Sequence, residues 1–381
     1  MQRVASDWEI AMFLRNCWYV AGWDMELPEG GFLPITIAGD PLLIYRTSPD
    51  GRLVAIEDRC CHRLAPLSKG RLEGGCNVRC MYHGLMFAPS GECIEIPGQD
   101  RIPSSARVRT YAVVARHSWI WVWLGDAAAA DETLIPAAVG YDHPDYVLRH
   151  GNMDYAANYQ LINDNLTDFS HLSYVHANSF GATEHWARSR PTIKVIDRGI
   201  RVSRWIAAED QGLKQDAPAA SRAGWSGPVA LYSTYDYLAP GVLLMKSGMY
   251  RPEDMPADRV SPPVAAAITE NFTSQAVTPL TERSTRYFFS WGPTRATGDE
   301  AMADGMRALA ETAFTEDREM IEAQQAMIDL KPGREMLTSA DVGPVQMRAV
   351  LRKLIKAERG DADIEDPGDP ETAHRRRELA A

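Results

Sequence analysis

Two pairs of cysteine and histidine stand close together in the first quarter of the chain, where they could hold a metal centre. Cys60 and His62 form a Cys-x-His pair. After a gap of 17 residues, Cys80 and His83 form a Cys-x-x-His pair. Thiolate is a soft ligand and imidazole a borderline one, so two of each suit either a tetrahedral zinc ion or a [2Fe–2S] cluster. In the cluster, the cysteines would bind one iron and the histidines the other.

Zinc and all-cysteine sites are the alternatives to this cluster. Zinc sites usually pair cysteine with cysteine and histidine with histidine, whereas each pair here mixes the two ligand types. Cys61 adjoins His62 and is too close to it for both to chelate one ion, so Cys60 is the better ligand. Cys76 and Cys80 could instead belong to an all-cysteine site. The mixed spacing favours the iron–sulfur cluster.

A second group of possible metal ligands lies within 13 residues: Asp164, Asp168, His171 and His176. On a regular helix, at about 100° per residue, Asp164, Asp168 and His171 share one face. Two acids four residues apart repel each other on a helix, so we expect a cation on this face. His171 and His176 lie about 140° apart, so they could bind one metal only if the helix is distorted or ends between them. The segment is therefore expected to bend around an ion.

A mononuclear Fe(II) site with two histidines needs one further acid. The long helix expected over 302–330 offers Asp317, which lies at the centre of the apolar stripe of that helix. The neighbouring acids Glu316, Glu319 and Glu322 are predicted to point away from this stripe. A carboxylate among apolar side chains requires a compensating charge, so we expect a metal ion here, with a buried ion pair to arginine as the alternative.

The elements that must position these groups fall into two parts. Residues 42–126 read as short strands separated by turns, which is typical of a small antiparallel β domain. Residues 150–360 read as an open sheet with helices. The helices are expected over 157–175, 302–330 and 345–358, and the strands over 192–207, 229–247, 264–277 and 284–291. We expect an α+β fold with domains over 10–145 and 146–360, followed by a mobile acidic tail over 361–381.

Composition excludes several classes of protein. The chain has 381 residues and a formal net charge of −11, which argues against a nucleic-acid partner because such partners are held by positive charge. No stretch reaches the roughly 18 consecutive apolar residues of a membrane helix. The first nine residues show no secretory leader, and six cysteines in a chain of this size are no disulfide scaffold. We therefore expect a cytoplasmic protein without a nucleic-acid or membrane partner.

The first group of motifs resembles a Rieske domain. The resemblance rests on the pairs Cys60-x-His62 and Cys80-x-x-His83, followed by the hairpin at 87–93. It implies a [2Fe–2S] cluster in which Cys60 and Cys80 bind one iron and the two histidines bind the other. Imidazole ligands raise the potential of such a cluster, which suits an electron donor to an oxygen-activating iron.

The second group of motifs resembles the oxygenase component of Rieske non-heme iron oxygenases. The spacing of acids and histidines over 164–176 and the helix around Asp317 carry this resemblance, and the segment 13–23 is most like the vanillate O-demethylase branch. The resemblance implies that His171, His176 and Asp317 bind a mononuclear Fe(II), with O2 as co-substrate. It also implies a catalytic domain of the helix-grip type, in which helices flank an antiparallel sheet.

The resemblance further implies partners and a substrate pocket. In the family, the electron crosses between subunits of a homotrimer through a carboxylate that links a cluster histidine to an iron histidine, and Asp168 is the matching position. No G-x-G-x-x-G fingerprint for a dinucleotide is present, so a separate reductase, with or without a ferredoxin, is expected to supply electrons from NAD(P)H. Gln275 and Trp291 are pocket candidates, and Gln275 stands where the branch often has histidine.

The expected function is that of the oxygenase component of a multicomponent Rieske monooxygenase. Its substrate would be an aromatic or related small organic compound, oxidised by O- or N-demethylation, other dealkylation or hydroxylation. Cis-dihydroxylation of an aromatic ring is the alternative reaction. A Rieske electron-transfer protein and a zinc-bound binding module are alternatives of another class, and both leave the second histidine group and Asp317 without a role.

Overall fold

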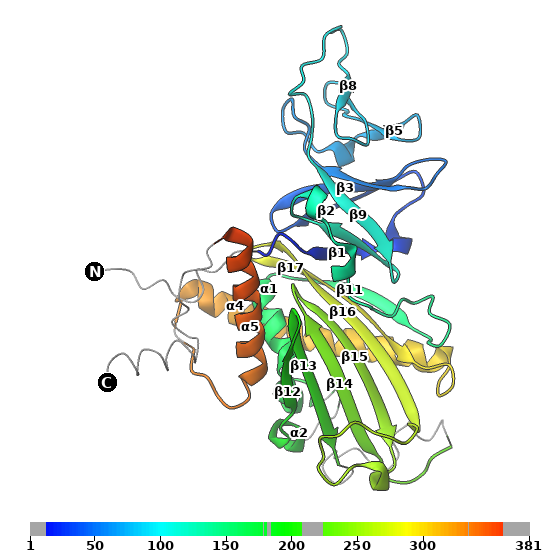
Figure 1. Cartoon of the computed structure of the whole chain (residues 1–381), viewed down its shortest axis with the longest axis vertical. Coiled ribbons are helices and arrows are strands. Elements are labelled where there is room, and N and C mark those ends of the chain that lie inside the picture. The colour runs from blue at the N-terminus through cyan, green and yellow to red at the C-terminus, as the bar shows by residue number, and fades with distance from the viewer. Residues whose placement is uncertain (1–12, 178, 181–183, 208–223, 334, 361–381) are drawn as a thin grey trace, which may run out of the picture.

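The computed structural model describes residues 13–177, 179–180, 184–207, 224–333 and 335–360. The expected tail over 361–381 and the first three residues of the expected first domain lie outside these ranges. Within them, no helix combines the length and the apolar character needed to cross a membrane. The chain forms two bodies, of which the N-terminal one stands at the top of Figure 1 and the larger C-terminal one at the bottom.

The N-terminal body is built from two antiparallel sheets. Its larger sheet has the strand order β1-β10-β9-β4-β3-β2, and its smaller sheet has the order β5-β6-β7-β8. The strands are β1 (Trp18–Trp23), β2 (Phe32–Ile37), β3 (Asp40–Arg46), β4 (Leu53–Glu57), β5 (Arg71–Glu73), β6 (Asn77–Arg79), β7 (Met86–Phe87), β8 (Cys93–Glu95), β9 (Thr110–Arg116) and β10 (Trp119–Trp123). The loop after β4 carries the first Cys-His pair, and the loop after β6 carries the second.

The C-terminal body is an antiparallel sheet with helices on one face. Its strand order is β11-β17-β16-β15-β14-β13-β12. The strands are β11 (Arg149–Tyr155), β12 (Thr192–Ile196), β13 (Gly199–Ile206), β14 (Ala230–Leu238), β15 (Val242–Tyr250), β16 (Thr269–Thr281) and β17 (Ser284–Pro293). The helices are α1 (Tyr159–Thr167), the 3-10 helix η6 (Phe169–Ser173), α2 (Glu184–Arg188), α4 (Glu300–Leu330) and α5 (Val342–Arg359). The expected α+β fold, with helices flanking an antiparallel sheet, is confirmed.

Both faces of this sheet are buried, but against different partners. One face packs against α1, α4 and α5, and Leu243 and Val277 belong to that core. The opposite face packs against the tryptophan-rich strands β1 and β10, through Val242 and Ala276 among others. Successive side chains of a strand point to opposite faces, so neighbouring residues of one strand alternate between the two cores. This alternation decides which residues can reach the helix-covered site.

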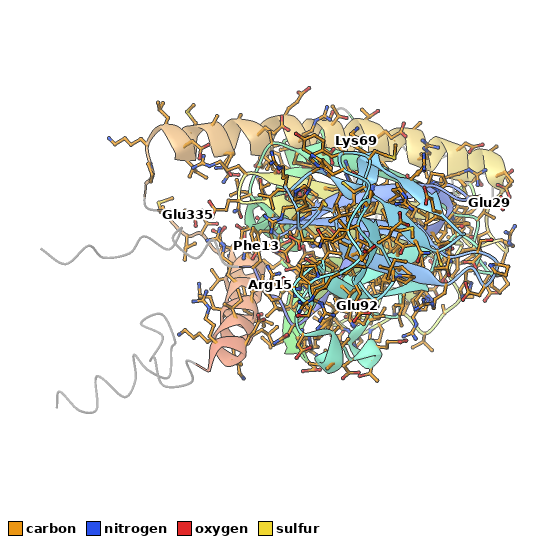
Figure 2. The ribbon with its side chains drawn as sticks, turned by 90° about the horizontal axis from the view of Figure 1, so that it is seen from above. Phe13, Arg15, Glu29, Lys69, Glu92 and Glu335 are labelled. Atoms are coloured by element: carbon orange, nitrogen blue, oxygen red, sulfur yellow. The ribbon has the colours of Figure 1, made fainter. Side chains whose placement is uncertain are left out.

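The start of the described chain is fastened to the last helix. The backbone N–H groups of Arg15 and Asn16 donate to the carboxylate of Glu358 in α5, at 2.9 and 3.0 Å. Figure 2 shows Phe13 and Arg15 beside this helix. The ring of Phe13 also packs against Tyr159 of α1, with ring centroids 5.7 Å apart. The N-terminal segment thus binds to the same helices that cover the catalytic sheet.

Two expected strands are hairpins in the structure. The run predicted as one strand over 192–207 contains β12 and β13, which pair antiparallel with Ile196 opposite Gly199. The sequence predicts a single strand over 229–247, whereas β14 and β15 pair antiparallel, with Leu238 opposite Val242. Pro240 and Gly241 lie between these two strands, and both residue types favour turns. The long apolar run therefore folds back on itself.

The helix expected over 157–175 is also shorter than predicted. It ends at Thr167, because Asp168 adopts an extended backbone conformation with φ −130° and ψ 103°. The Asp168 carboxylate then accepts the backbone N–H of Ser170 and so begins the 3-10 helix η6. The prediction that Asp164, Asp168 and His171 share one helical face is therefore wrong, while the expected distortion of the segment is present before both histidines.

Candidate metal centres and active site

The two Cys-His pairs of the N-terminal body lie on loops with the same hydrogen-bond pattern. In each loop, the cysteine N–H donates to a carbonyl five residues later, and the cysteine carbonyl accepts an N–H four residues later. The partners are Ala65 and Leu64 for Cys60, and Leu85 and Gly84 for Cys80. Leu64 and Gly84 both have positive φ, at 60° and 78°, which turns each loop back on its cysteine. The two loops, Cys60–Ala65 and Cys80–Leu85, therefore have the same backbone conformation around their cysteines, and we call them the two cradles.

The four candidate ligands divide by burial. Cys60 and Cys80 are each 2% exposed, whereas His62 and His83 lie at the surface with ring centroids 4.6 Å apart. Burial, with Cys80 close by, raises the pKa of Cys60 to about 11, so a thiolate there needs a metal to stabilise it. Two buried sulfurs beside two surface imidazoles fit a cluster that exposes its histidine-bound iron.

Cys76 and Cys61, the other cysteines considered as ligands, lie outside the two loops' hydrogen-bond pattern. The Cys76 thiol lies 3.6 Å from the side-chain oxygen of Asn77, in the turn between β5 and β6. Its backbone carbonyl accepts the Tyr45 hydroxyl at 3.0 Å. Cys61 is exposed beside the first cradle. Neither Cys76 nor Cys61 shows the backbone hydrogen-bond pattern that Cys60 and Cys80 share.

In the C-terminal body the structure brings His171, His176 and Asp317 together. One carboxylate oxygen of Asp317 lies 3.5 Å from His171 Nε2, and the other lies 3.2 Å from His176 Nε2. One potential ligand atom from each residue lies within 4.8 Å of the other two. His176 and Asp317 are almost fully buried, at 1% and 4% exposure. Two imidazoles and one carboxylate that converge in this way match the ligand set of mononuclear Fe(II) oxygenases.

His171 reaches this site because the chain breaks at Asp168. The backbone carbonyl of Asp168 lies 2.5 Å from His171 Nδ1, which places the proton on Nδ1 and leaves Nε2 free to bind a metal. Burial lowers the pKa of His171 and so favours its neutral, metal-binding form. The Asp168 carboxylate itself accepts the backbone N–H and the hydroxyl of Ser170, at 2.8 and 2.9 Å.

His176 is held by a residue that the sequence analysis assigned elsewhere. The Glu316 carboxylate accepts the His176 Nδ1–H at 2.9 Å and the Ser179 hydroxyl at 2.6 Å. Burial alone would lower the pKa of His176, but the carboxylates of Asp317 and Glu316 raise it. The prediction that Glu316 points away is therefore wrong: it flanks the apolar stripe of α4, and its side chain is long enough to reach back to His176.

Asn165 is a second site residue that the sequence analysis missed. Its side-chain amide donates to Asp317 Oδ1 at 3.0 Å and lies 3.4 Å from His171 Nε2. An amide in the last turn of α1, two residues before the helix ends at Thr167, is the signal that could have identified it. It fixes one oxygen of the carboxylate and leaves the other toward His176.

The cation expected beside Asp164 is an arginine. Arg348 of α5 donates to the Asp164 carboxylate, with Nε 2.9 Å from Oδ1. Arg348 also pairs with Glu335 at 2.9 Å. Burial raises the pKa of Asp164, so the guanidinium is needed to keep this carboxylate charged. Asp164 therefore joins α1 to α5 and takes no part in the metal site.

Helix α4 also fixes the beginning of α1. The Glu322 carboxylate accepts the backbone N–H of Ala156 at 2.8 Å, and the Gln325 amide oxygen accepts that of Asn158 at 2.9 Å. Asn158 is the N-cap of α1. One helix thus supplies Asp317, supports His176 through Glu316 and anchors the segment that leads to His171.

The two predicted pocket residues lie on the helix-facing side of the sheet. Trp291 packs near Phe180, with ring centroids 6.3 Å apart, and Phe180 packs against His176 at 5.1 Å. Gln275 is 5% exposed, and its side-chain oxygen has no hydrogen-bond partner among the described residues. Its amide nitrogen is 3.4 Å from the Thr273 hydroxyl. A buried polar atom without a partner is costly, and the Gln275 oxygen is therefore available to accept a hydrogen bond from a bound ligand.

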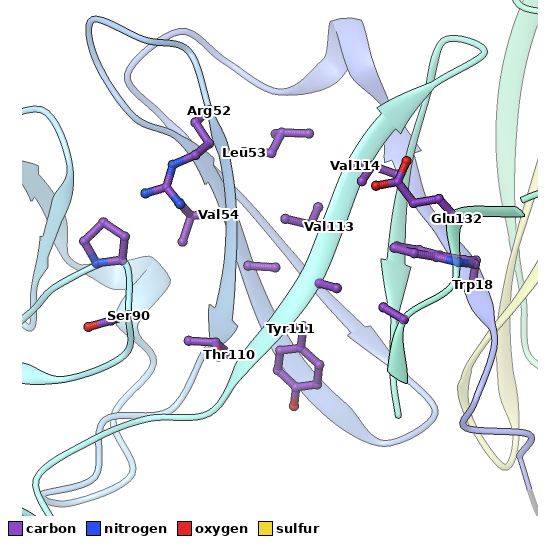
Figure 3. A pocket seen from close by; sticks show the side chains of 14 residues that line it. Trp18, Arg52, Leu53, Val54, Ser90, Thr110, Tyr111, Val113, Val114 and Glu132 are labelled. Carbon is purple, nitrogen blue, oxygen red and sulfur yellow. The ribbon is translucent and has the colours of Figure 1, made fainter. Parts of the chain in front are cut away.

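A separate cavity of about 440 Å³ lies on the N-terminal body (Figure 3). It opens where β4 and β9 separate after two paired positions, and Trp18 and Glu132 line its far side. None of the candidate metal ligands lines it. It is therefore not the cavity in which the metal site would meet a substrate.

Comparison with known proteins identifies the class of this site. Residues 17–112 match the Rieske [2Fe-2S] domain, and residues 155–357 match the vanillate O-demethylase oxygenase C-terminal domain. The chain belongs to the Rieske non-heme iron oxygenases, in the vanillate O-demethylase branch. This confirms the resemblance found in the sequence.

Relatives and solved structures extend over nearly the whole of this oxygenase. The iron–sulfur subunit of the toluene-4-sulfonate monooxygenase system of Comamonas testosteroni is 39% identical, over 92% of this chain and 99% of that subunit. The vanillate O-demethylase oxygenase subunit of Pseudomonas sp. (strain HR199 / DSM 7063) is 32% identical, over 92% and 98%. The crystal structure of dicamba monooxygenase bound to dicamba matches with a TM-score of 0.77 at 30% identity, over 91% and 99%.

The family fixes the kind of enzyme. This Rieske oxygenase carries a [2Fe–2S] cluster and a mononuclear iron, and it works as one component of a multicomponent system. A Rieske electron-transfer protein without oxygenase activity and a zinc-binding module do not fit a chain that matches the oxygenase along both of its bodies.

Proposed function

We propose that this Rieske oxygenase is a monooxygenase that oxidises a methyl or other alkyl carbon of a small aromatic substrate, by O- or N-demethylation or by hydroxylation. The observation that carries the proposal is the convergence of His171, His176 and Asp317 beneath a helix-covered sheet. The relatives named as a toluene-4-sulfonate monooxygenase and a vanillate O-demethylase support this reaction class over ring dihydroxylation.

The residues divide the work as follows. Cys60, His62, Cys80 and His83 would hold the [2Fe–2S] cluster. His171, His176 and Asp317 would hold the mononuclear iron, which when bound activates O2 for attack on the substrate. The side chains around them keep the ligands in one protonation state and one orientation, and this is the contribution of the protein itself.

Three contacts of the chain do this work at the mononuclear site. The Asp168 carbonyl holds the proton of His171 on Nδ1, and the Glu316 carboxylate does the same for His176. The Asn165 amide donates to Asp317 and thereby orients its carboxylate. Each ligand therefore presents its free lone pair toward one point without rearrangement.

We propose that electrons reach this site from the cluster of a neighbouring subunit in a homotrimer. The loops after β4 and β6 belong to the body at the top of Figure 1, whereas η6 follows α1 in the body at the bottom. Asp168 stands at the start of η6 with its carbonyl on His171, and its carboxylate would contact a surface histidine of the neighbouring cluster. A separate reductase, with or without a ferredoxin, would supply the electrons from NAD(P)H. A cytoplasmic location remains a prediction from the sequence.

Gln275 and Trp291 are proposed as substrate-pocket residues. The indole of Trp291 donates to Asn271 at 2.8 Å, which fixes the ring beside Phe180. A fixed indole offers an aromatic substrate a flat apolar surface. Gln275 offers a hydrogen-bond acceptor in place of the histidine that the branch often has at this position.

Metal analysis combined with labelled oxygen tests this proposal. We expect about three irons per chain and a Rieske-type electron paramagnetic resonance signal, two irons coming from the cluster and one from the mononuclear site. With ¹⁸O₂, a methyl-aryl substrate should gain one labelled oxygen atom, either in an alcohol product or in a released aldehyde. Two labelled atoms in a ring diol would overturn the monooxygenase assignment, and two irons per chain would overturn the assignment of the mononuclear site.

A further inference from the structure

Strand register arranges the helix-facing side of the catalytic sheet in rows. One row consists of Ile200, Tyr237, Leu243, Gln275 and Phe289, and it is mostly apolar. The next row consists of Val202, Tyr235, Met245, Thr273 and Trp291. The third row consists of Arg204, Ser233, Ser247 and Asn271, which are all polar, and it ends at Pro293 of β17; we call it the polar row. Directly opposed residues of paired strands point to the same face, so all three rows face the helices.

The metal site lies over the middle row. Phe169, two residues before His171, packs on Tyr235 with ring centroids 5.0 Å apart. Phe180 joins His176 to Trp291 at the other end of the same row. The polar row is two residues further along each strand, or about 6.6 Å. A substrate that extends from the metal across one row of side chains would therefore end at the polar row.

Arg204 is the charged group of this row, and within the part of the chain that the structure describes it lacks a counter-charge. Its side chain is buried at 8% exposure and donates one hydrogen bond, to the backbone carbonyl of Trp186 at 3.3 Å. No carboxylate of the described residues forms an ion pair with it; Asp168 acts on it only at longer range. Burial lowers the pKa of Arg204, yet a guanidinium keeps its charge at neutral pH.

Arg201 on the same strand provides the comparison. Its side chain points to the opposite face, where it makes a two-pronged ion pair with Asp236 at 2.6 and 2.7 Å. The exposed Arg201 thus has an acidic partner, whereas the buried Arg204 has none among the described residues. An unpaired buried charge is expensive, so its retention at Arg204 calls for an anion that binds there.

We propose that Arg204, with the hydroxyls of Ser233 and Ser247, binds the anionic head group of the substrate, a sulfonate or carboxylate on the ring carbon remote from the oxidised methyl. A guanidinium presents N–H groups in a planar fork that matches two oxygens of such a group. The inference rests on the proposed function, since it places the other end of the same substrate over the metal. The proposal requires the substrate to carry a negative charge, and this requirement comes from Arg204 and not from the metal ligands.

Calorimetric titration of the intact wild-type enzyme, anaerobic and with both metal centres loaded, is the first test. The probes are toluene-4-sulfonate, 4-methylbenzoate and the neutral isostere toluene-4-sulfonamide. We expect at least one of the two anions to bind ten times more tightly than the sulfonamide, and the stronger anion identifies the head group. Equal or tighter binding of the neutral sulfonamide would overturn the proposal. Because no turnover is involved, this result is independent of whether the enzyme is a monooxygenase.

The variant Arg204→Gln separates anion binding from a structural role. Glutamine can still donate to the Trp186 carbonyl, so a purely structural arginine would be largely replaced. We expect Arg204→Gln to lose at least tenfold in affinity for the preferred anion and to bind the sulfonamide as the wild type does, while Arg201→Gln binds both unchanged. A similar loss for anion and sulfonamide, or no loss for either, would contradict the assignment. Should Arg204→Gln fail to fold, the wild-type comparison still decides.

Discussion

Single side chains at the mononuclear site act in pairs, one as ligand and one as support. Asp317 lies on the apolar stripe of α4, and the adjacent Glu316 turns from the edge of that stripe to His176. A carboxylate on the far nitrogen of a metal-bound imidazole fixes its tautomer and strengthens it as a ligand. Two consecutive acids of one helix thus serve the same metal in different ways.

Removal of the support should weaken the metal site without affecting the cluster. We expect Glu316→Ala to lower iron affinity at the mononuclear site by about 10- to 100-fold, and Glu316→Gln to lower it less because an amide oxygen can still accept the His176 proton. Chelator competition measures the affinity, and the Rieske signal serves as an internal reference. Glu319→Gln, one turn away on the exposed side of α4, is the control and should retain its iron. Unchanged iron affinity in Glu316→Ala would contradict this role.

At the scale of elements, the site depends on the break between α1 and η6. Asp168 ends the helix, caps the 3-10 helix with its carboxylate and holds His171 with its carbonyl. Asparagine caps a helix about as well as aspartate does. A change of Asp168 to asparagine therefore removes a charge and leaves the local structure in place.

We expect Asp168→Asn to retain both metal centres and to turn over about 10 to 100 times more slowly. Stopped-flow measurement of cluster oxidation in a single turnover reports the electron-transfer step directly. Ser170→Ala removes a hydroxyl from the same carboxylate but keeps its charge, so it should react at nearly the wild-type rate. Wild-type cluster oxidation in Asp168→Asn would rule out the carboxylate as the electron path.

The packing of α1 against α5 depends on an ion pair that is largely withdrawn from solvent. Arg348→Met would leave the Asp164 carboxylate without its partner, and we expect a loss of about 3 kcal/mol in the free energy of unfolding. Urea denaturation followed by circular dichroism measures this loss. The double variant Asp164→Leu/Arg348→Met should recover much of the stability, because neither charge then remains buried. A single variant as stable as the wild type would show that the pair contributes little.

At the scale of the whole molecule, the two metal sites of one chain belong to different bodies. The cluster loops, which follow β4 and β6, belong to the N-terminal body, and the ligands of the mononuclear iron come from η6, the segment after it and α4 of the C-terminal body; Figure 1 shows the two bodies one above the other. A ring of subunits packed head to tail can bring the cluster of one chain to the iron of the next. In the proposed trimer, activity would therefore be a property of the assembly.

Mixed assemblies test this arrangement. Cys80→Ser disables the cluster and Asp317→Ala disables the mononuclear site, so neither variant should be active alone. If electrons cross between subunits, random mixing in equal amounts should restore about one quarter of wild-type activity, since half the subunits keep their iron and half of those have a neighbour with a cluster. Activity that stays at the level of the separate variants would place the electron path within one chain.

Local sequence sufficed for the groups whose chemistry follows from residue type and short spacing. The pairs Cys60–His62 and Cys80–His83 span three and four residues, so each pair fits in one loop. Together they predict a cluster without knowledge of the fold. The position of Asp317 on an apolar stripe follows from helical periodicity alone. Short motifs and helical periodicity depend only on neighbours in sequence. The cluster and the buried position of Asp317 could therefore be predicted without the tertiary structure.

Only the tertiary structure decided which residues meet across the fold. Asp164 pairs with Arg348, which is 184 residues away, and Glu316 meets His176, which is 140 residues away. That Arg204 has no acidic partner among the described residues, and lies one row beyond the metal site, became visible only from the strand register and contacts. Such contacts depend on the packing of helices on the sheet, and helical periodicity specifies the face of a side chain but not the partner that will cover it.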